Sequence, residues 1–363
     1  MKTAGMYIIK MYFAFGGIKQ MTTNSSYESS VPHQVRLTAP EIANIWSQYQ
    51  NDTMVVCVYK YMLKIVEDVS IRPILEYSLQ LAQGHITKIK QYFTEEKFPI
   101  PRGFTEADVN LSAPRLFSDE LCLTYTYLMS INGMMGYAAA VSTSMRRELR
   151  DYFTQCQNET MDLYNKTLDL LLEKGIVSRP PFIYPSDQVE FIKQQGFMEG
   201  LLGGKRPLDC IEISNLYWNL KKIQLSKTIT MAFAQIAKSD EVKKFLWRGV
   251  EIYRKHIEIF EALLTINNLP TPKSEEAEVT NSTISPFSER LMMFHKALFG
   301  STTISSYGTA IATCHRKDLG VHYSRLLVEM ANYMEDGFHI MITNNWAEQP
   351  PLAPDRKDLA MNK

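Results

Sequence analysis

The chain repeats itself over a long distance, and this duplication constrains its fold more than any other feature. The stretch GHITKIKQYFTEEKFPIP occupies residues 84–101, and KHIEIFEALLTINNLPTP occupies residues 255–272, so the second lies 171 positions after the first. When the two stretches are aligned, they share His85/His256, Ile86/Ile257, Thr94/Thr265, Pro99/Pro270 and Pro101/Pro272. A match of this kind indicates one structural unit that is used twice.

The duplication extends well beyond these stretches. Leu37, Glu41, Ile42 and Asn44 match Leu208, Glu212, Ile213 and Asn215 at the same spacing. After one deletion in a loop, the spacing becomes 170 for Phe117/Phe287, Tyr137/Tyr307, Arg146/Arg316, Glu159/Glu329 and Pro180/Pro350. We therefore predict a first repeat at residues 37–175 and a second repeat at residues 208–346.

A Pro/Gly-rich linker at 176–207 would contain a short helix and pack on a domain through Phe191, Ile192, Phe197 and Leu201. Residues 347–363 would form a C-terminal tail.

The first 36 residues are predicted to be an extension outside the repeats. Residues 1–20 are largely apolar, but Lys10 interrupts the run and no A-x-A cleavage site follows. The run is also too short to span a bilayer. We predict that translation starts naturally at Met21 and that residues 22–36 are flexible. A signal or membrane anchor, and an ordered extra segment, are the alternatives.

Each repeat has the pattern of four helices. Thr38 to Glu41 form a capping box with Pro40 in the first turn, and Asp209 to Glu212 repeat the box. An apolar stripe at helical spacing follows, containing Ile71, Ile74, Leu75, Ala82, Ile86, Ile89 and Phe93. It should stop before Pro99, and its copy before Pro270, because a residue that precedes proline is pushed out of the helical region.

The third helix of each repeat is rich in small residues, SINGMMGYAAAVSTS at 130–144 and GSTTISSYGTAIATC at 300–314. No stretch has the pattern of a long strand. Four long helices in each repeat, with a longer connection between the second and third, predict an all-α fold. We expect a tandem duplication of a four-helix bundle.

Composition argues against two classes of partner. Lys+Arg and Asp+Glu both number 39, so no net charge attracts the chain to nucleic acid or to an anionic membrane.

The five cysteines are scattered and show no metal-ligand spacing, which is typical of a reducing compartment. We therefore expect a cytoplasmic protein. Its partners would be other proteins or further copies of itself.

The repeated histidine is predicted to have a packing role. His85 and His256 lie on the inward stripes, where a buried imidazole would bond to a tyrosine, a carboxylate or a carbonyl. A metal site is the alternative, and only the second repeat offers ligands for it. His256, His295, Asp336 and His339 could converge on iron or zinc in the bundle core. The first repeat has Tyr125 and Asp169 where His295 and His339 fall, and these two side chains would hydrogen-bond His85 without a metal.

A complete di-iron site is not expected in either repeat. Such a site needs a Glu from each of two helices and a Glu-x-x-His pair from each of the other two. Gln80 stands five residues before His85 and Glu251 five residues before His256, which is the wrong spacing. Asp52 is available on the first helix of the first repeat. We predict no catalytic residues and no resident cofactor.

Several segments resemble a known family. VRLTAPEIANIW, FTEADVNLSAPRLFSD, EKGIVSRPPFI, EVTNSTISPFSERLMMFH and ITNNWAEQPPLAPDRK are similar to members of the domain of unknown function 3231 family, over residues 35–358. The resemblance implies that the fold is a tandem duplication of a ferritin-like four-helix bundle. Members of the family occur mainly in endospore-forming bacteria and are often regarded as spore coat related, which implies a location in the mother cell or the spore. No catalytic residues of the family can be transferred. The expected function is a non-catalytic, structural or interaction role in sporulation or stress. The alternative is a metal-binding protein with redox or storage activity.

Overall fold

The structure is a computed structural model that describes residues 35–201 and 205–361. Leu37–Lys363 form one compact unit. The predicted start at Met21 lies outside the described residues, as does nearly all of the extension at 1–36.

Eight long helices within the described residues form two successive groups of four. The first repeat contains α2 (Ala39–Ile65), α3 (Arg72–Glu95), α4 (Asp119–Thr143) and α5 (Arg147–Glu173). The second repeat contains α6 (Cys210–Ile236), α7 (Asp240–Ile266), α8 (Glu289–Thr313) and α9 (Lys317–Thr343). The short helices are η1 (Glu106–Asp108), η2 (Gln195–Met198), η3 (Glu276–Glu278) and α10 (Arg356–Met361).

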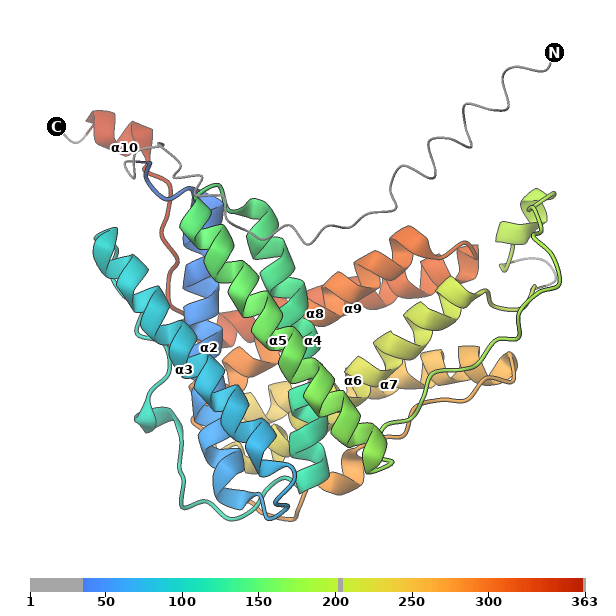
Figure 1. Cartoon of the computed structure of the whole chain (residues 1–363), viewed down its shortest axis with the longest axis horizontal. Helices are drawn as coiled ribbons and strands as arrows, with labels where there is room; N and C mark the ends of the chain where they lie inside the picture. The colour runs from blue at the N-terminus through green and yellow to red at the C-terminus, as the bar shows by residue number, and fades with distance from the viewer. Residues whose placement is uncertain (1–34, 202–204, 362–363) are drawn as a thin grey trace, which may run out of the picture. The chain divides into compact units, whose positions relative to one another are not determined.

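Both groups pack in the same way. In the first repeat α2 contacts α3 and α4, and α5 contacts α3 and α4; α6, α7, α8 and α9 make the corresponding contacts in the second repeat. The first group runs from blue to green and the second from yellow to red (Figure 1). The fold is therefore all-α and consists of two similar four-helix halves, which confirms the predicted fold class.

Both predicted capping boxes are present. The Thr38 backbone N–H donates to Glu41 Oε2 at 2.7 Å, and the Asp209 N–H donates to Glu212 Oε2 at 3.1 Å. Both glutamates are fully buried. From the loop that joins the third and fourth helices of its repeat, Glu41 also accepts the N–H groups of Met145 and Arg146, and Glu212 accepts that of Arg316. Each box therefore ties the start of one helix to a distant turn.

Helices α3 and α7 both end before their prolines, as predicted, but earlier than the residue that precedes proline. Helix α3 ends at Glu95 and α7 at Ile266, each four residues before its proline. The residues between include Lys97 and Asn268, whose φ angles are 57° and 54°. A left-handed residue of this kind terminates many helices.

The long connections between the second and third helices join the two repeats. Val109 pairs with Phe287 and Phe117 pairs with Val279, both in antiparallel bridges. Because Val109 and Val279 are equivalent, and so are Phe117 and Phe287, the two bridges are copies of each other. Four backbone hydrogen bonds at the junction also form two pairs of equivalent contacts. The Asn110 N–H donates to the Pro286 carbonyl, and its equivalent, the Thr280 N–H, donates to the Leu116 carbonyl. In the same way the Ser118 N–H donates to the Glu278 carbonyl and the Ser288 N–H to the Asp108 carbonyl. The repeats thus meet as two copies do in an isologous dimer.

The apolar core is continuous through the second repeat and across the junction, but interrupted in the first. One cluster of buried residues draws members from both repeats. A smaller one lies within the first repeat alone and contains Ile45, Tyr49, Ile89 and Phe93. Polar residues fall between the two clusters along α2 and α3.

The linker differs in part from the prediction. It contains η2, a single 3-10 turn, and Phe197 of this turn lies 3.8 Å from the Arg206 guanidinium. Phe191 and Ile192, however, are exposed, as are Phe182 and Tyr184. The expected packing of Phe191 and Ile192 on a domain is therefore wrong, because this stretch extends away from the buried surface.

Candidate functional site

A layer of polar side chains interrupts the core of the first repeat. It consists of Gln48 and Asp52 on α2, His85 on α3 and Tyr137 on α4. Gln48, Asp52 and His85 are each at most 7% exposed. Gln48 and Asp52 share one face of α2 because they are four residues apart.

His85 occupies the centre of this layer between two acids. Its Nδ1 lies 3.4 Å from Asp52 Oδ2 and 3.4 Å from the Tyr137 hydroxyl, and its Nε2 lies 3.3 Å from Glu159 Oε2 on α5. Burial lowers the pKa of His85, but interactions with Asp52 and Cys156 outweigh it and raise the pKa well above the ordinary value. Burial raises the pKa of Asp52, and His85 opposes this rise. Burial and the attraction between His85 and Asp52 therefore act in opposite directions on the pKa of each group.

A pocket of about 550 Å³ lies beside this layer. Residues of α2, α3, α4 and α5 line it, together with Leu298, Ser301, Thr302 and Ser305 of α8 in the second repeat. Two buried oxygens on its lining residues, Gln48 Oε1 and Asn132 Oδ1, have no hydrogen-bond partner, whereas Asp52 Oδ2 has the His85 ring as its ion-pair partner. Pockets of this size accept small ligands in other proteins.

The second repeat has a different centre at the equivalent position. His256 is fully buried, with Nδ1 3.0 Å from the Tyr307 hydroxyl and Nε2 3.1 Å from Glu329 Oε2. Ile223 stands where the first repeat has Asp52. Burial lowers the pKa of His256 to about 4, although Glu329 partly offsets this effect. His256 is therefore neutral at pH 7.

These contacts confirm that both repeated histidines are buried and bonded to tyrosine or carboxylate. They correct one detail for the first repeat. His85 is not held by Tyr125 and Asp169: Asp169 is exposed, and Tyr125 contacts the second repeat instead. The acid that lies next to the His85 ring is Asp52 on α2.

The four candidate metal ligands do not gather at one point. His295 is buried, and its Nε2 lies 2.8 Å from the Tyr125 hydroxyl. Asp336 is exposed and pairs with Arg248 at 2.7 Å, and His339 is exposed on the same helix. Among the described residues, the one group of three His, Cys, Asp or Glu side chains with ligand-like spacing contains none of the four. The geometry therefore gives no support to a shared site for His256, His295, Asp336 and His339.

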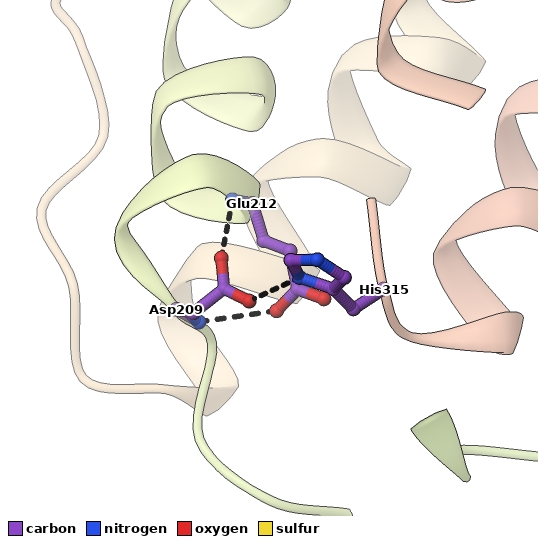
Figure 2. Close-up of side chains that lie close together, drawn as sticks. All are labelled: Asp209, Glu212 and His315. Carbon is purple, nitrogen blue, oxygen red and sulfur yellow. Dashed lines mark hydrogen bonds and ion pairs between the residues drawn. The ribbon is translucent and has the colours of Figure 1, made fainter. Parts of the chain in front are cut away.

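That group is Asp209, Glu212 and His315 at the start of α6 (Figure 2). Asp209 Oδ1 accepts the N–H groups of Ile211 and Glu212, and His315 Nδ1 lies 2.9 Å from Asp209 Oδ2. The Arg206 guanidinium binds both oxygens of Glu212, at 2.8 and 2.9 Å. A metal ion would have to displace this cation, so we assign the group to helix capping.

Sequence reasoning noted Asp52 but missed its pairing with His85. The available signal was the Gln48 and Asp52 pair, two polar residues one turn apart on a helix with many apolar positions. It also missed Glu159, although Glu159 and Glu329 match in the duplication. Both acids reach His85 from other helices.

The fold and site define a tandem four-helix-bundle protein with a polar layer in one half. The family described as protein of unknown function DUF3231 matches residues 25–189 and again residues 196–359. The chain belongs to this family, as its sequence motifs indicated. No curated protein matches the chain.

One similar solved structure is that of a candidate spore coat protein from Bacillus halodurans C-125. It is 15% identical, the match covers 42% of this chain and 98% of that one, and the TM-score is 0.38. No helix among the described residues is long and apolar enough to cross a membrane.

Proposed function

We propose that this protein is a non-catalytic tandem helical bundle with a structural or interaction role in sporulation or stress. It would act inside the cell on other proteins or on copies of itself. The observation that carries the proposal is the closed centre of the second repeat. His256 has both ring nitrogens engaged, by Tyr307 and Glu329, and an isoleucine fills the position of the first repeat's acid.

The junction between the repeats supports the same proposal. Its reciprocal bridges and hydrogen bonds use the loops that lead into α4 and α8 to hold the two halves together. A chain that fixes two bundles in this way is suited to present surfaces at a constant spacing. The spore context rests on the family resemblance described above.

Elemental analysis tests the non-catalytic part of the proposal against the metal-binding alternative. Wild-type, His85→Gln and His256→Gln protein would each be expressed with iron or zinc and purified without further added metal. We expect no stoichiometric metal in any of the three. One equivalent of metal that His256→Gln abolishes would favour the metal-binding alternative, and a content halved by either variant would mean two equivalent sites.

A deletion strain tests the biological role. We expect loss of the gene from an endospore-forming host to alter spore resistance or coat composition. Because the proposed role does not depend on histidine chemistry, expression of a folded His256→Gln variant should restore the wild-type phenotype. Normal spores and normal stress survival without the gene would contradict the proposal.

A further inference from the structure

The outer face of α9 carries a series of exposed apolar side chains. Val321, Val328, Phe338 and Ile342 are 54%, 56%, 55% and 51% exposed. They belong to a set of exposed residues, here called the α9 seam, in which steps of three and four residues alternate: Val321, Ser324, Val328, Ala331, Glu335, Phe338 and Ile342. This spacing is the heptad pattern by which one helix packs along another. The opposite face of α9 is buried in its own repeat, so the helix has two apolar faces and only one of them is covered.

The first repeat does not carry the same seam. Asp151 and Asn158 of α5 stand where α9 has Val321 and Val328, and both are exposed. Because the two repeats share one fold, the fold itself does not require valine at these positions. Valine is also a weaker helix former than most residues found on helix surfaces. The two valines therefore indicate a contact that lies outside the second repeat.

The α9 seam matches itself when two copies of the helix lie antiparallel. Val321 then lies level with Phe338 of the other copy, and Val328 lies level with Ala331, because both pairs are centred on the same point of the helix. The small side chain of Ala331 leaves room for the valine that it faces. In a twofold arrangement each of these contacts is made twice.

The one charged position of the α9 seam is matched in the same register. Glu335 lies level with Ser324 of the other copy, and Arg325 is the next residue along. In the part of the chain that the structure describes, neither Glu335 nor Arg325 belongs to an ion pair. Within one copy they are about 15 Å apart along the helix, so they cannot pair with each other. Between antiparallel copies the two charges are complementary.

We propose that two copies of this chain associate through their α9 seams as an antiparallel, twofold-symmetric pair. The proposal rests on the interaction role proposed above and names a second copy as the partner. Because a single pair of helices forms a small interface, we expect monomer and dimer to exchange with concentration.

Sedimentation equilibrium of the full chain over a range of concentrations tests the proposal. We expect a single monomer–dimer equilibrium. Val321→Asp combined with Val328→Asn installs the residues of the first repeat, which has the same fold, and should raise the dissociation constant at least about tenfold, since each change acts twice in the pair. Met161→Asn removes an exposed apolar side chain from α5 and should leave the dissociation constant unchanged.

A charge exchange tests the register. Glu335→Arg and Arg325→Glu should each weaken association by about threefold or more, because like charges then meet twice in the pair. The double variant should recover most of the lost affinity. Since the two residues are too far apart to pair within one copy, such a recovery requires contact between copies. Additive losses in the double variant would contradict the antiparallel register.

Three further results would overturn the proposal in variants whose circular dichroism and melting match the wild type. A full chain that stays monomeric would exclude the pair, and the deletion strain would still test the role toward other proteins. If only a chain that begins at Val35 dimerised, the α9 seam would belong to residues 1–34. Dimers that survive the α9 changes but are lost in Phe182→Ser with Phe191→Ser would assign the association to the linker.

Discussion

Tyr125 and His295 occupy equivalent positions in the two repeats, and they hydrogen-bond to each other, with the Tyr125 hydroxyl 2.8 Å from His295 Nε2. In a pair of copies related by a twofold axis, a residue near that axis meets its own equivalent. This contact therefore places the pseudo-twofold axis of the duplication between α4 and α8, where both side chains are buried.

Removing the Tyr125 hydroxyl should destabilise the whole compact unit. In Tyr125→Phe the buried His295 loses the partner of Nε2, and its Nδ1 already has none. We expect the free energy of unfolding to fall by about 1–3 kcal/mol. Urea denaturation of the full chain would measure the change, with the exposed Tyr184→Phe as the control that should have no effect. An unchanged midpoint in Tyr125→Phe would show that the contact does not couple the repeats.

Acid should destabilise the protein through its buried neutral histidines. Burial lowers the pKa of His256 from 6.5 to about 4 and that of His295 to about 3. Unfolding therefore takes up protons at these sites below pH 6.5, so stability is lost as the pH falls from about 6.5 towards 4. Chemical denaturation across this range should show the loss. His256→Gln should flatten the profile, whereas the exposed His339→Gln should not; equal slopes in the two variants would argue against a neutral His256.

Lys296 should give a slope of the same sign at higher pH. It is buried in the second repeat, with Nζ 2.9 Å from the Tyr253 hydroxyl, and burial lowers its pKa from 10.5 to about 7. Unfolding then takes up a proton between about pH 7 and 10.5, so this residue makes stability rise with pH across that range. Lys296→Met should be more stable at pH 7 by about 1 kcal/mol or more. Its advantage should shrink as the pH rises, and a constant difference would show that Lys296 keeps an ordinary pKa.

Glycines at the contact between α7 and α9 should not tolerate alanine. A Cβ at Gly249 would lie 2.2 Å from Tyr333 Oη, and one at Gly337 would lie 2.5 Å from the Phe245 ring. Neither ring can move easily, because they stack with centroids 4.4 Å apart and Tyr333 donates a hydrogen bond to the Phe245 carbonyl. Each substitution should cost about 1–3 kcal/mol.

Gly136→Ala on α4 is the matched control for those substitutions. A Cβ there meets nothing within 4 Å, so the helix propensity of alanine should raise stability by about 1 kcal/mol. Thermal melts of the three variants provide the comparison. Equal effects at Gly249 and Gly136 would mean that α7 and α9 are not in close contact.

The helices could be predicted because their signals are local. Capping residues such as Thr38 and Asp209, the stops before Pro99 and Pro270, and the duplication itself are all read from short stretches or fixed offsets. These signals identified the all-α class, the number of long helices in each repeat and the inward position of both repeated histidines.

The contacts between helices could not be predicted in the same way. Whether Asp52 reaches His85, or Tyr125 meets His295, depends on how each helix is rotated about its own axis. The sequence pattern restricts that rotation only to a broad apolar face. The proposed grouping of His295 with His339 failed for the same reason, because His339 falls on the exposed side of α9.

The central claim is that the duplicated histidine has diverged, so that the first repeat keeps a charged polar layer while the second keeps a neutral, closed centre. The ¹⁵N chemical shifts of the histidine rings at pH 7.5 test it most directly, with His85→Gln and His256→Gln used to assign the two signals. We expect His85 to show the shifts of an imidazolium, because its pKa is raised, and His256 to show those of a neutral imidazole, because its pKa is about 4. The same protonation state in both rings would contradict the account.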